Sequence, residues 1–364
     1  MHNLDEIPTP ALILDASVVH RNIQRLADYA KQSSLKIRPH TKTHKSRRVA
    51  VLQQEAGAIG LTVAKVGEAE TISTAGEDLL LAYPPVDKFR AERLARLAHD
   101  RTVRAAIDST MALAAVAEAA QHAEVTIGLL VDLDVGMGRT GLQSPQQALA
   151  LARAIESKAG VRLDGIMCYP GHIWQTAEKQ EAALQAVDAK LQETIDCWSH
   201  SGLEAAIVSG GSTPTAYQSH HITNLTEIRP GTYVYNDMNT VHGTFCTLDD
   251  CAARILCTVI SDAVPGQVVI DAGSKTLTSD RCLPAPQSGH GYVLEYPLAK
   301  IVQLSEEHGQ IDTTACDQQP SVGERVTVIP NHICPCINLQ DAVWWHQPEG
   351  SLQRLTIDAR GKLS

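Results

Sequence analysis

The sequence predicts a (β/α)8 barrel of the TIM type joined to a second, mainly β domain. The chain has 364 residues, which suits a barrel of about 250 residues plus a smaller unit. From Leu35 to about Tyr235, short apolar runs alternate with longer segments of helical period. After about Asn239 the helical period fades, and β-branched runs alternate with Gly, Pro and Asp turns.

Eight apolar runs make up the predicted barrel sheet. Stretches rich in Ala, Glu, Lys and Gln separate them, and Gln146–Ser157 and Thr176–Ser199 carry apolar residues at helical spacing. A doubly wound open sheet also alternates strands with helices, so the count of eight favours the barrel. The predicted strands are Leu35–Lys42, Ala58–Ala64, Leu79–Tyr83, Val103–Ile107, Val125–Leu133, Val161–Cys168, Ala205–Ser209 and Glu227–Tyr233.

The remaining strands are predicted in the second domain. The opening run Pro8–Asp15 fits either unit. We expect residues 11–238 to form the barrel, and residues 239–364, with about 1–10, to form the β-rich domain. Its predicted strands are Ala252–Ala263, Gln267–Asp271, Leu298–Leu304, Glu324–Pro330 and Leu352–Asp358.

Composition excludes several classes of protein. The net charge is -10 without a basic block, which argues against binding to nucleic acid or to an anionic membrane surface. Apolar runs stay below the length of about 18 residues that spans a membrane, and Met1–Pro10 does not have the pattern of a signal peptide. Nine scattered cysteines favour free thiols and a cytoplasmic location, with Cys246, Cys251 and Cys257 read as packing residues.

The segment Arg38–Lys45 is the first candidate site. On a strand, Arg38, His40 and Lys42 would share one face at the C-terminal end, where barrel active sites form, and His44 has the same parity. Crowding by like charge lowers the pKa of a lysine, which favours Lys42 as a Schiff-base nucleophile. A solvated basic edge that binds an anion is the alternative.

The turn Ser209–Pro214 is a candidate phosphate site. It follows the seventh predicted strand, and barrels often bind phosphate after strands seven and eight. Glycine lets the backbone approach an anion, and Ser212 and Thr213 offer hydroxyl donors. An ordinary turn is the alternative.

The segment Pro330–Cys336 is a candidate metal site. His332 and Cys334 are two positions apart, so on extended backbone they would face one side, as two ligands of one metal would. Imidazole and thiolate suit zinc better than magnesium. Cys336 has the same parity and is either a third ligand or a free thiol.

Together these segments resemble the D-serine dehydratase/D-threonine aldolase family, within the alanine-racemase-like fold of pyridoxal 5'-phosphate (PLP) enzymes. The resemblance runs through nearly the whole chain in the family's order. The matching segments are Arg38–Lys45, Asp134–Gly141, Ser209–Pro214, Arg229–Tyr233, Asp271–Lys275, Ser305–Gly309 and Pro330–Pro335.

The resemblance implies a homodimer with PLP at the barrel mouth and a D-amino acid as substrate. Lys42 matches the family's Schiff-base lysine, with Lys45 as the alternative. Tyr169 and His172 are implied as catalytic side chains, although their segment departs from the aldolase pattern. The implied cofactor contacts are Lys42, His40, Arg139, Tyr169, Gly211, Ser212, Thr213 and Tyr235, and the implied metal ligands are His332 and Cys334.

The implied reaction is elimination of water from a D-β-hydroxy amino acid, with D-serine giving pyruvate and ammonia. Cys334 favours this, because many aldolases of the family carry aspartate there and zinc-using dehydratases carry thiolate. Zn2+ is therefore the expected metal, with Mn2+, Mg2+ or Co2+ as alternatives. Cleavage of D-threonine or 3-hydroxy-D-aspartate by an aldolase is the alternative activity, ahead of a racemase or a non-catalytic PLP-binding protein.

Overall fold

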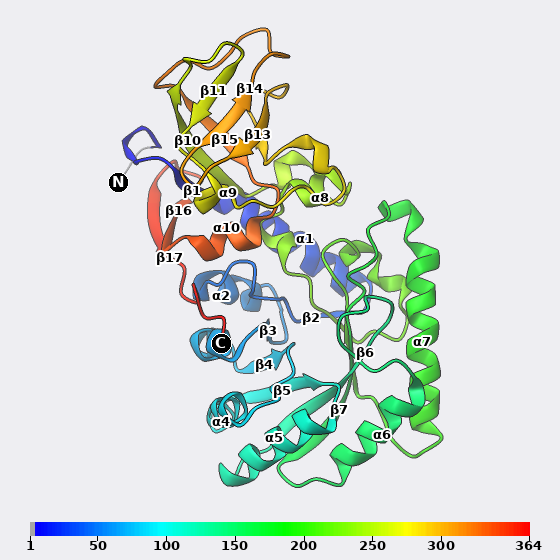
Figure 1. Cartoon of the computed structure of the whole chain (residues 1–364). Helices are drawn as coiled ribbons and strands as arrows, with labels where there is room; N and C mark the ends of the chain where they lie inside the picture. The colour runs from blue at the N-terminus through cyan, green and yellow to red at the C-terminus, as the bar shows by residue number, and fades with distance from the viewer. Residues whose placement is uncertain (1–3) are drawn as a thin grey trace. The chain divides into compact units, whose positions relative to one another are not determined.

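The computed structural model describes residues 4–364, which divide into two compact units, each built around its own sheet (Figure 1). The predicted domain ranges, 11–238 and 239–364, stay predictions. We use the name barrel unit for Gln24–Lys42, Ser46–Gly231 and Gly361–Ser364, and the name β unit for Met1–Ile23, Thr43–Lys45 and Thr232–Arg360.

Eight parallel strands form the sheet of the barrel unit, as predicted. A parallel bridge between His40 and Thr62 joins the two ends of this sheet, and the amide of Thr41 donates to the carbonyl of Thr62 at 2.9 Å. In sheet order the strands are β2 (Lys36–Ile37), β9 (Glu227–Ile228), β8 (Ile207–Gly210), β7 (Val161–Cys168), β6 (Ile127–Leu133), β5 (Thr102–Ile107), β4 (Asp78–Leu81) and β3 (Leu61–Val63).

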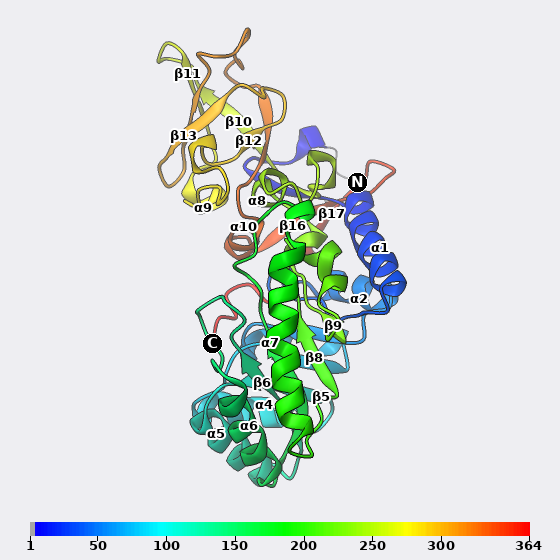
Figure 2. The same cartoon turned by 90° about the vertical axis from the view of Figure 1, so that its right-hand side faces the viewer.

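Helices follow the strands along the chain, and Figure 2 shows the long helix α7 in front of the barrel strands. Local sequence sets where they begin: Ser144 accepts a hydrogen bond from the amide of Gln147, and Pro145 takes the first helical position of α6. The helices are α1 (Ala16–Gln32), α2 (Arg47–Glu55), α3 (Val66–Ile72), α4 (Lys88–Leu97), α5 (Thr110–His122), α6 (Pro145–Glu156) and α7 (Glu181–Ser199).

The first barrel strand is shorter than predicted. β2 ends at Ile37, and residues 41–44 form a turn. Pro39 has no amide hydrogen to donate to a neighbouring strand, so the ladder is interrupted at that position. The expectation that Arg38, His40, Lys42 and His44 share one face of a continuous strand is therefore wrong.

The β unit is built on a nine-stranded sheet. β1 pairs antiparallel with β10 and parallel with β16, so the opening run joins this sheet. The sequence did not predict β12, β14 and β16. The strands are β1 (Ala11–Asp15), β10 (Ala253–Ser261), β11 (Gln267–Ile270), β12 (Tyr292–Val293), β13 (Lys300–Leu304), β14 (Gly309–Asp312), β15 (Arg325–Ile329), β16 (Ala342–His346) and β17 (Leu352–Thr356); the helices are α8 (Met238–His242), α9 (Ser274–Leu277) and α10 (Ile333–Leu339).

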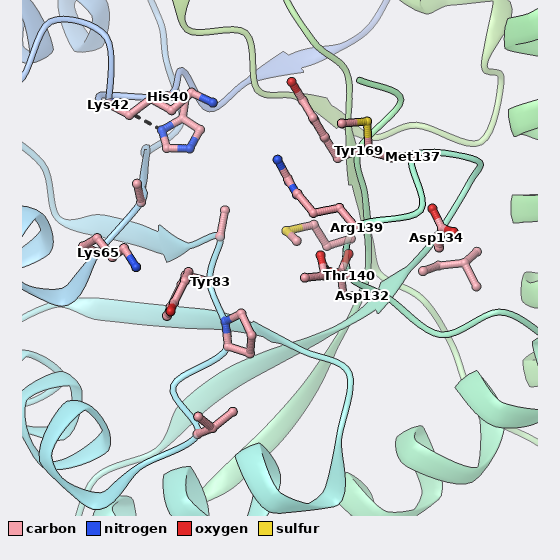
Figure 3. Close-up of a pocket in the computed structure, with 16 residues that line it drawn as sticks. His40, Lys42, Lys65, Tyr83, Asp132, Asp134, Met137, Arg139, Thr140 and Tyr169 are labelled. Carbon is pink, nitrogen blue, oxygen red and sulfur yellow. Dashed lines mark hydrogen bonds between the residues drawn. The ribbon is translucent and has the colours of Figure 1, made fainter. Parts of the chain in front are cut away.

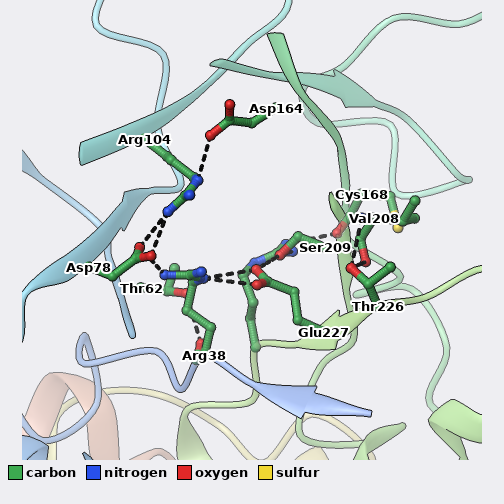
Figure 4. A network of polar contacts seen from close by, with 11 residues as sticks. Arg38, Thr62, Asp78, Arg104, Asp164, Cys168, Val208, Ser209, Thr226 and Glu227 are labelled. Carbon is green, nitrogen blue, oxygen red and sulfur yellow. Dashed lines mark hydrogen bonds and ion pairs between the residues drawn. The ribbon is translucent and has the colours of Figure 1, made fainter. Parts of the chain in front are cut away.

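A buried polar network ties the barrel strands together (Figure 4). Arg38 pairs with Glu227 at 2.9 Å and with Asp78 at 2.5 Å. Arg104 extends the chain of ion pairs, contacting Asp78 and Asp164 at 2.6 Å each. Because Arg38 and Glu227 are both almost fully buried, each charge depends on the other for its stabilisation.

No helix among residues 4–364 is both long enough and apolar enough to cross a membrane.

Candidate functional site

A cavity of about 510 Å³ opens at the C-terminal ends of the barrel strands (Figure 3). This is the face on which barrel enzymes build their active sites. Three of the predicted cofactor residues besides Lys42 reach it. The lining residues are His40, Lys42, Ala64, Lys65, Ala82, Tyr83, Pro84, Val86, Asp132, Leu133, Asp134, Met137, Arg139, Thr140, Met167 and Tyr169.

Lys42 lies in the turn that follows β2, and its ammonium nitrogen is 5.9 Å from the centre of the Tyr169 ring. The amide of Lys42 donates to Nδ1 of His40 at 3.4 Å. Arg38 takes part in the buried network instead of lining the cavity. The turn thus brings Lys42 and His40 to the cavity without the continuous strand that the sequence suggested.

Lys45, the alternative to Lys42, does not line the cavity. It belongs to the β unit, its side chain is buried, and its carbonyl accepts a hydrogen bond from the amide of Ala359 at 3.0 Å. Of the two lysines, Lys42 is therefore the one whose amine faces an open space of ligand size.

Arg139 lies against Tyr169, with 4.7 Å between the guanidinium carbon and the ring centre, and Figure 3 shows the two side chains on the same side of the cavity. Arg139 sits in the loop after β6, which Asp134 holds by accepting hydrogen bonds from the amides of Gly136 and Gly138 at 3.1 and 3.0 Å. Burial acts to raise the pKa of Asp134, but these hydrogen bonds and one that the side-chain amide of Gln143 donates outweigh it and lower the pKa. The loop is therefore anchored by an ionised carboxylate.

Asp132, at the end of β6, was not predicted as a site residue. Its carboxylate accepts a hydrogen bond from the hydroxyl of Thr140 at 2.8 Å. Burial raises the pKa of Asp132 to about 6. Lys65 and Tyr83 were also missed. Lys65 directly follows the predicted strand Ala58–Ala64 and Tyr83 ends the predicted strand Leu79–Tyr83, and these positions are the signal that could have found them.

His172 does not line the cavity. Its side chain is exposed, and its ring lies next to Gly136, where an added Cβ would be 2.8 Å from Nε2. The ring therefore lies beside the Asp134–Gly141 loop of the barrel unit. The catalytic role expected for His172 stays a prediction.

The predicted phosphate turn follows β8, the seventh strand of the barrel in chain order. Gly211 has a φ of +83°, which favours glycine, and an added Cβ would come within 3.2 Å of Ile228. The Ser212 and Thr215 hydroxyls are 3.0 Å apart. None of Gly211, Ser212 and Thr213 lines the cavity described above, so their cofactor contact stays a prediction.

Tyr235 belongs to the β unit, and its side chain is fully buried. Its hydroxyl has no hydrogen-bond partner among residues 4–364. Burial raises the pKa of this phenol far above its usual value, so the hydroxyl stays protonated as a donor. An unsatisfied buried donor is costly, and a ligand oxygen would remove that cost.

His332 and Cys334 come together in the β unit, but not on a strand as predicted. His332 is the extended residue before α10, and Cys334 lies in the first turn of that helix. Pro335 is tolerated there because first-turn amides have no intrahelical partner. The side chains of His332 and Cys334 are hydrogen-bonded to each other. They are therefore close enough to bind the same cation.

The surroundings of this pair favour a positive charge. Nδ1 of His332 lies 2.9 Å from the carboxylate of Asp280. Burial would lower the pKa of His332, but Cys334, Asp237 and Asp280 together raise it to about 9. The hydroxyls of Thr43 and Thr232 lie 3.2 and 3.6 Å from the sulfur of Cys334, positions from which both can donate to a thiolate.

Cys336 was left open as a third metal ligand or a free thiol, and that choice stays a prediction. Its sulfur is buried and donates to the carbonyls of Leu277 and His332, both at 3.3 Å. Burial raises the pKa of the Cys336 thiol well above its usual value. No group of three or more His, Cys, Asp or Glu side chains positioned for a metal occurs within residues 4–364, so water or substrate would have to complete the shell. All nine cysteines are free thiols.

Two family models match the chain in succession. The model for "Alanine racemase, N-terminal domain" matches residues 14–239, and the model for "Putative serine dehydratase domain" matches residues 252–345. Together they span most of the two units.

Three curated relatives match nearly the full length. A 3-hydroxy-D-aspartate aldolase from Paracoccus denitrificans (strain Pd 1222) is 31% identical over 98% of this chain and 93% of its own. A D-threonine aldolase from Arthrobacter sp is 27% identical, over 93% of this chain and 89% of its own. A D-serine dehydratase from Dictyostelium discoideum is 25% identical, covering 91% of each chain. The relatives thus carry both kinds of activity.

Solved structures agree with this grouping. D-threonine aldolase from Filomicrobium marinum superposes with a TM-score of 0.91 at 29% identity, covering 99% of this chain and 98% of its own. D-threo-3-hydroxyaspartate dehydratase from Delftia sp. HT23 also reaches 0.91, at 27% identity, covering 98% and 99%. Alanine racemase from Bacillus anthracis shares the fold at 14% identity, with a TM-score of 0.73 over 96% and 98%. The chain therefore belongs to the D-serine dehydratase/D-threonine aldolase family, in which an alanine racemase N-terminal domain precedes a serine dehydratase domain.

Proposed function

We propose that this chain is a lyase that uses PLP and a divalent metal ion to eliminate water from a D-β-hydroxy amino acid. Zinc is the metal that we favour. The paired His332 and Cys334 side chains carry the proposal. Solved variants of D-threo-3-hydroxyaspartate dehydratase have a histidine and a cysteine, two positions apart, each replaced by alanine, and the cysteine variant is in a metal-free form. His332 and Cys334 have the same order and spacing.

The described side chains fit both groups. Lys42, Arg139 and Tyr169 meet at a cavity large enough for a ligand, as an amine, a guanidinium and an aromatic face. The buried hydroxyl of Tyr235 has no hydrogen-bond partner within residues 4–364, which suits a donor for a phosphate oxygen. We assign Gly211, Ser212 and Thr213 to the phosphate and His40 to the cofactor's surroundings.

When bound, PLP supplies an electron sink for the substrate's α-carbon, and the metal supplies a Lewis acid for its β-hydroxyl. The amine of Lys42 takes the proton from the α-carbon as general base. Thr43 and Thr232 hold Cys334 as a thiolate ligand by donating to its sulfur. The carboxylate of Asp280 would orient the His332 ring through Nδ1, so that the other ring nitrogen could hold the metal.

Aldol cleavage is the second candidate, and the 31% identity to a 3-hydroxy-D-aspartate aldolase favours it. A metal on the β-hydroxyl serves both reactions, because it promotes loss of that oxygen or of its proton. We favour elimination because position 334 carries a cysteine.

We also propose that the protein is a homodimer, as the resemblance implies. Light scattering of the purified protein measures the mass of the assembly and tests this.

The products distinguish the two reactions. Purified enzyme loaded with PLP and zinc is incubated separately with D-serine, D-threonine and D-threo-3-hydroxyaspartate, and ammonia and glycine are both measured. Elimination releases one ammonia per turnover, with pyruvate from D-serine and oxaloacetate from the hydroxyaspartate. Aldol cleavage releases glycine and an aldehyde without ammonia. Glycine as the main product would reverse our choice, and the absence of both products would reject a lyase.

Two variants test the assigned groups. Lys42→Ala should abolish turnover and the visible absorbance of lysine-linked PLP, whereas Lys45→Ala should keep that absorbance. Cys334→Ala should lose bound zinc, measured by elemental analysis, and turnover. Cys316→Ala is the matched control, because Cys316 is a partly exposed cysteine outside the pair. If Cys334→Ala kept its full zinc content, Cys334 would not be a ligand of the metal.

A further inference from the structure

Lys65 is a cationic side chain in the cavity lining, and the proposed reaction assigns it no role. It lies two positions after the end of β3 and directly precedes α3, and Tyr83 lies two positions after the end of the neighbouring strand β4. The Lys65 ammonium lies 3.5 Å from the centre of the Tyr83 ring, and both side chains line the cavity (Figure 3). The parallel register of β3 and β4 therefore places an ammonium group at the cavity wall.

No carboxylate within residues 4–364 pairs with the Lys65 ammonium. The two carboxylates in the cavity lining have other partners. Asp132 accepts from Thr140, and Asp134 accepts from the amides of its own loop. The ammonium is thus balanced by the π face of Tyr83 alone, and that contact is weaker than an ion pair with a carboxylate.

The cavity lining carries more positive than negative groups. It contains three cationic side chains, Lys42, Lys65 and Arg139, and two carboxylates, Asp132 and Asp134. In the proposed function Lys42 and Arg139 are engaged with the cofactor, which leaves Lys65 as the lining cation without an assignment. The ring of Tyr83 restricts the ammonium, so less side-chain entropy is lost when an anion binds.

We propose that Lys65 binds a carboxylate of the amino-acid substrate, an inference that rests on the proposed function and deepens it. Two substrate groups have this chemistry. One is the α-carboxylate that every amino acid carries, and the other is the β-carboxylate of a hydroxyaspartate. The test below distinguishes these two sources.

The test compares Lys65→Met and Lys65→Arg with the wild-type enzyme. Lys88→Met is the control, since Lys88 is exposed and does not line the cavity. KM and kcat are measured with D-serine and with D-threo-3-hydroxyaspartate, and PLP content is measured by absorbance. Loss of a charge-assisted contact to a carboxylate should raise KM about 10- to 100-fold in Lys65→Met. Lys65→Arg should recover most of the loss, and Lys88→Met should show none.

The pattern identifies the carboxylate. An increase in KM for both substrates assigns Lys65 to the α-carboxylate, and an increase for the hydroxyaspartate alone assigns it to the β-carboxylate. An unchanged KM for both substrates overturns the proposal. Loss of PLP from Lys65→Met also overturns it, because Lys65 would then hold the cofactor.

Ligands without a β-hydroxyl separate this inference from the lyase proposal. D-aspartate and D-alanine cannot lose water or undergo aldol cleavage, and the change in PLP absorbance reports their binding. Lys65→Met should weaken D-aspartate binding about 10-fold or more, even if the wild-type enzyme proves inactive as a lyase. Equal affinity of variant and wild type for both ligands would reject Lys65 without bearing on the reaction.

Discussion

Asp280 contacts the proposed metal ligand His332 through one hydrogen bond. Its carboxylate lies 2.9 Å from Nδ1 of His332, and a histidine bound to metal commonly donates its other N–H to such a carboxylate. The contact fixes both the tautomer and the direction of the ring. Asp280 is 52 positions away from His332, so nothing in the local sequence identifies it.

We expect Asp280→Asn to weaken zinc binding by about 10- to 100-fold. The neutral amide would hold the His332 ring less firmly than the carboxylate does, and the negative charge next to the metal site would be lost. Competition with a chromogenic chelator measures the zinc affinity of the purified enzyme. Asp312→Asn is the control, since Asp312, the last residue of β14, accepts a hydrogen bond from the hydroxyl of Thr314 and lies outside the His332–Cys334 pair. If Asp280→Asn bound zinc as tightly as the wild type, the orienting role would be refuted.

At the level of elements, β7 shows how one irregular position shapes the barrel. The register between β6 and β7 shifts between Leu129 and Leu130, and Gly165 has a φ of +149°. An added Cβ at Gly165 would lie 1.9 Å from the carbonyl oxygen of Ile207 on β8. Next to this glycine, Asp164 reaches Arg104 in the buried network. Glycine is therefore needed where β7 and β8 approach each other.

Gly165→Ala should lower the free energy of unfolding by about 3 kcal/mol or more, because the methyl group overlaps backbone that cannot move freely. Gly202→Ala is the matched control: its φ is +76°, but no atom lies within 4 Å of the added Cβ, so we expect about 1 kcal/mol. Urea unfolding followed by circular dichroism compares the two. Equal losses would show that the close approach to Ile207 does not matter.

On the scale of the barrel unit, charge pairs join strands that are distant in the sequence. Arg38 on the segment after β2 bonds to Glu227 on β9 and to Asp78 on β4. Ser209 on β8 adds a hydrogen bond to Glu227 at 2.6 Å. Since these groups are buried, the loss of one member leaves another charged and unpaired.

Arg38→Met should therefore cost about 3–5 kcal/mol of unfolding free energy, since Glu227 would be left buried without its main cation. Arg93→Met removes an ion pair with the partly exposed Glu70 and should cost less than about 1 kcal/mol. The same urea titration measures both. A small effect at Arg38 would mean that Arg229 or water compensates for the lost charge.

The sequence by itself determined the class of fold and the principal chemical groups. Its apolar pattern located β7 to the residue, as Val161–Cys168, and the last five residues of this strand are buried. It failed at short strands such as β2 and β14 and at α10, where Pro335 and two cysteines resemble a loop more than a helix.

Only the tertiary structure decided which groups meet. It brings Lys42, Arg139 and Tyr169 to one cavity and adds Lys65, Tyr83 and Asp132, which no motif marks. It also removes Arg38 from that cavity and sets Asp280 beside His332. The physical reason is that periodicity reports which residues are buried, whereas pairing between distant strands determines which side chains become neighbours.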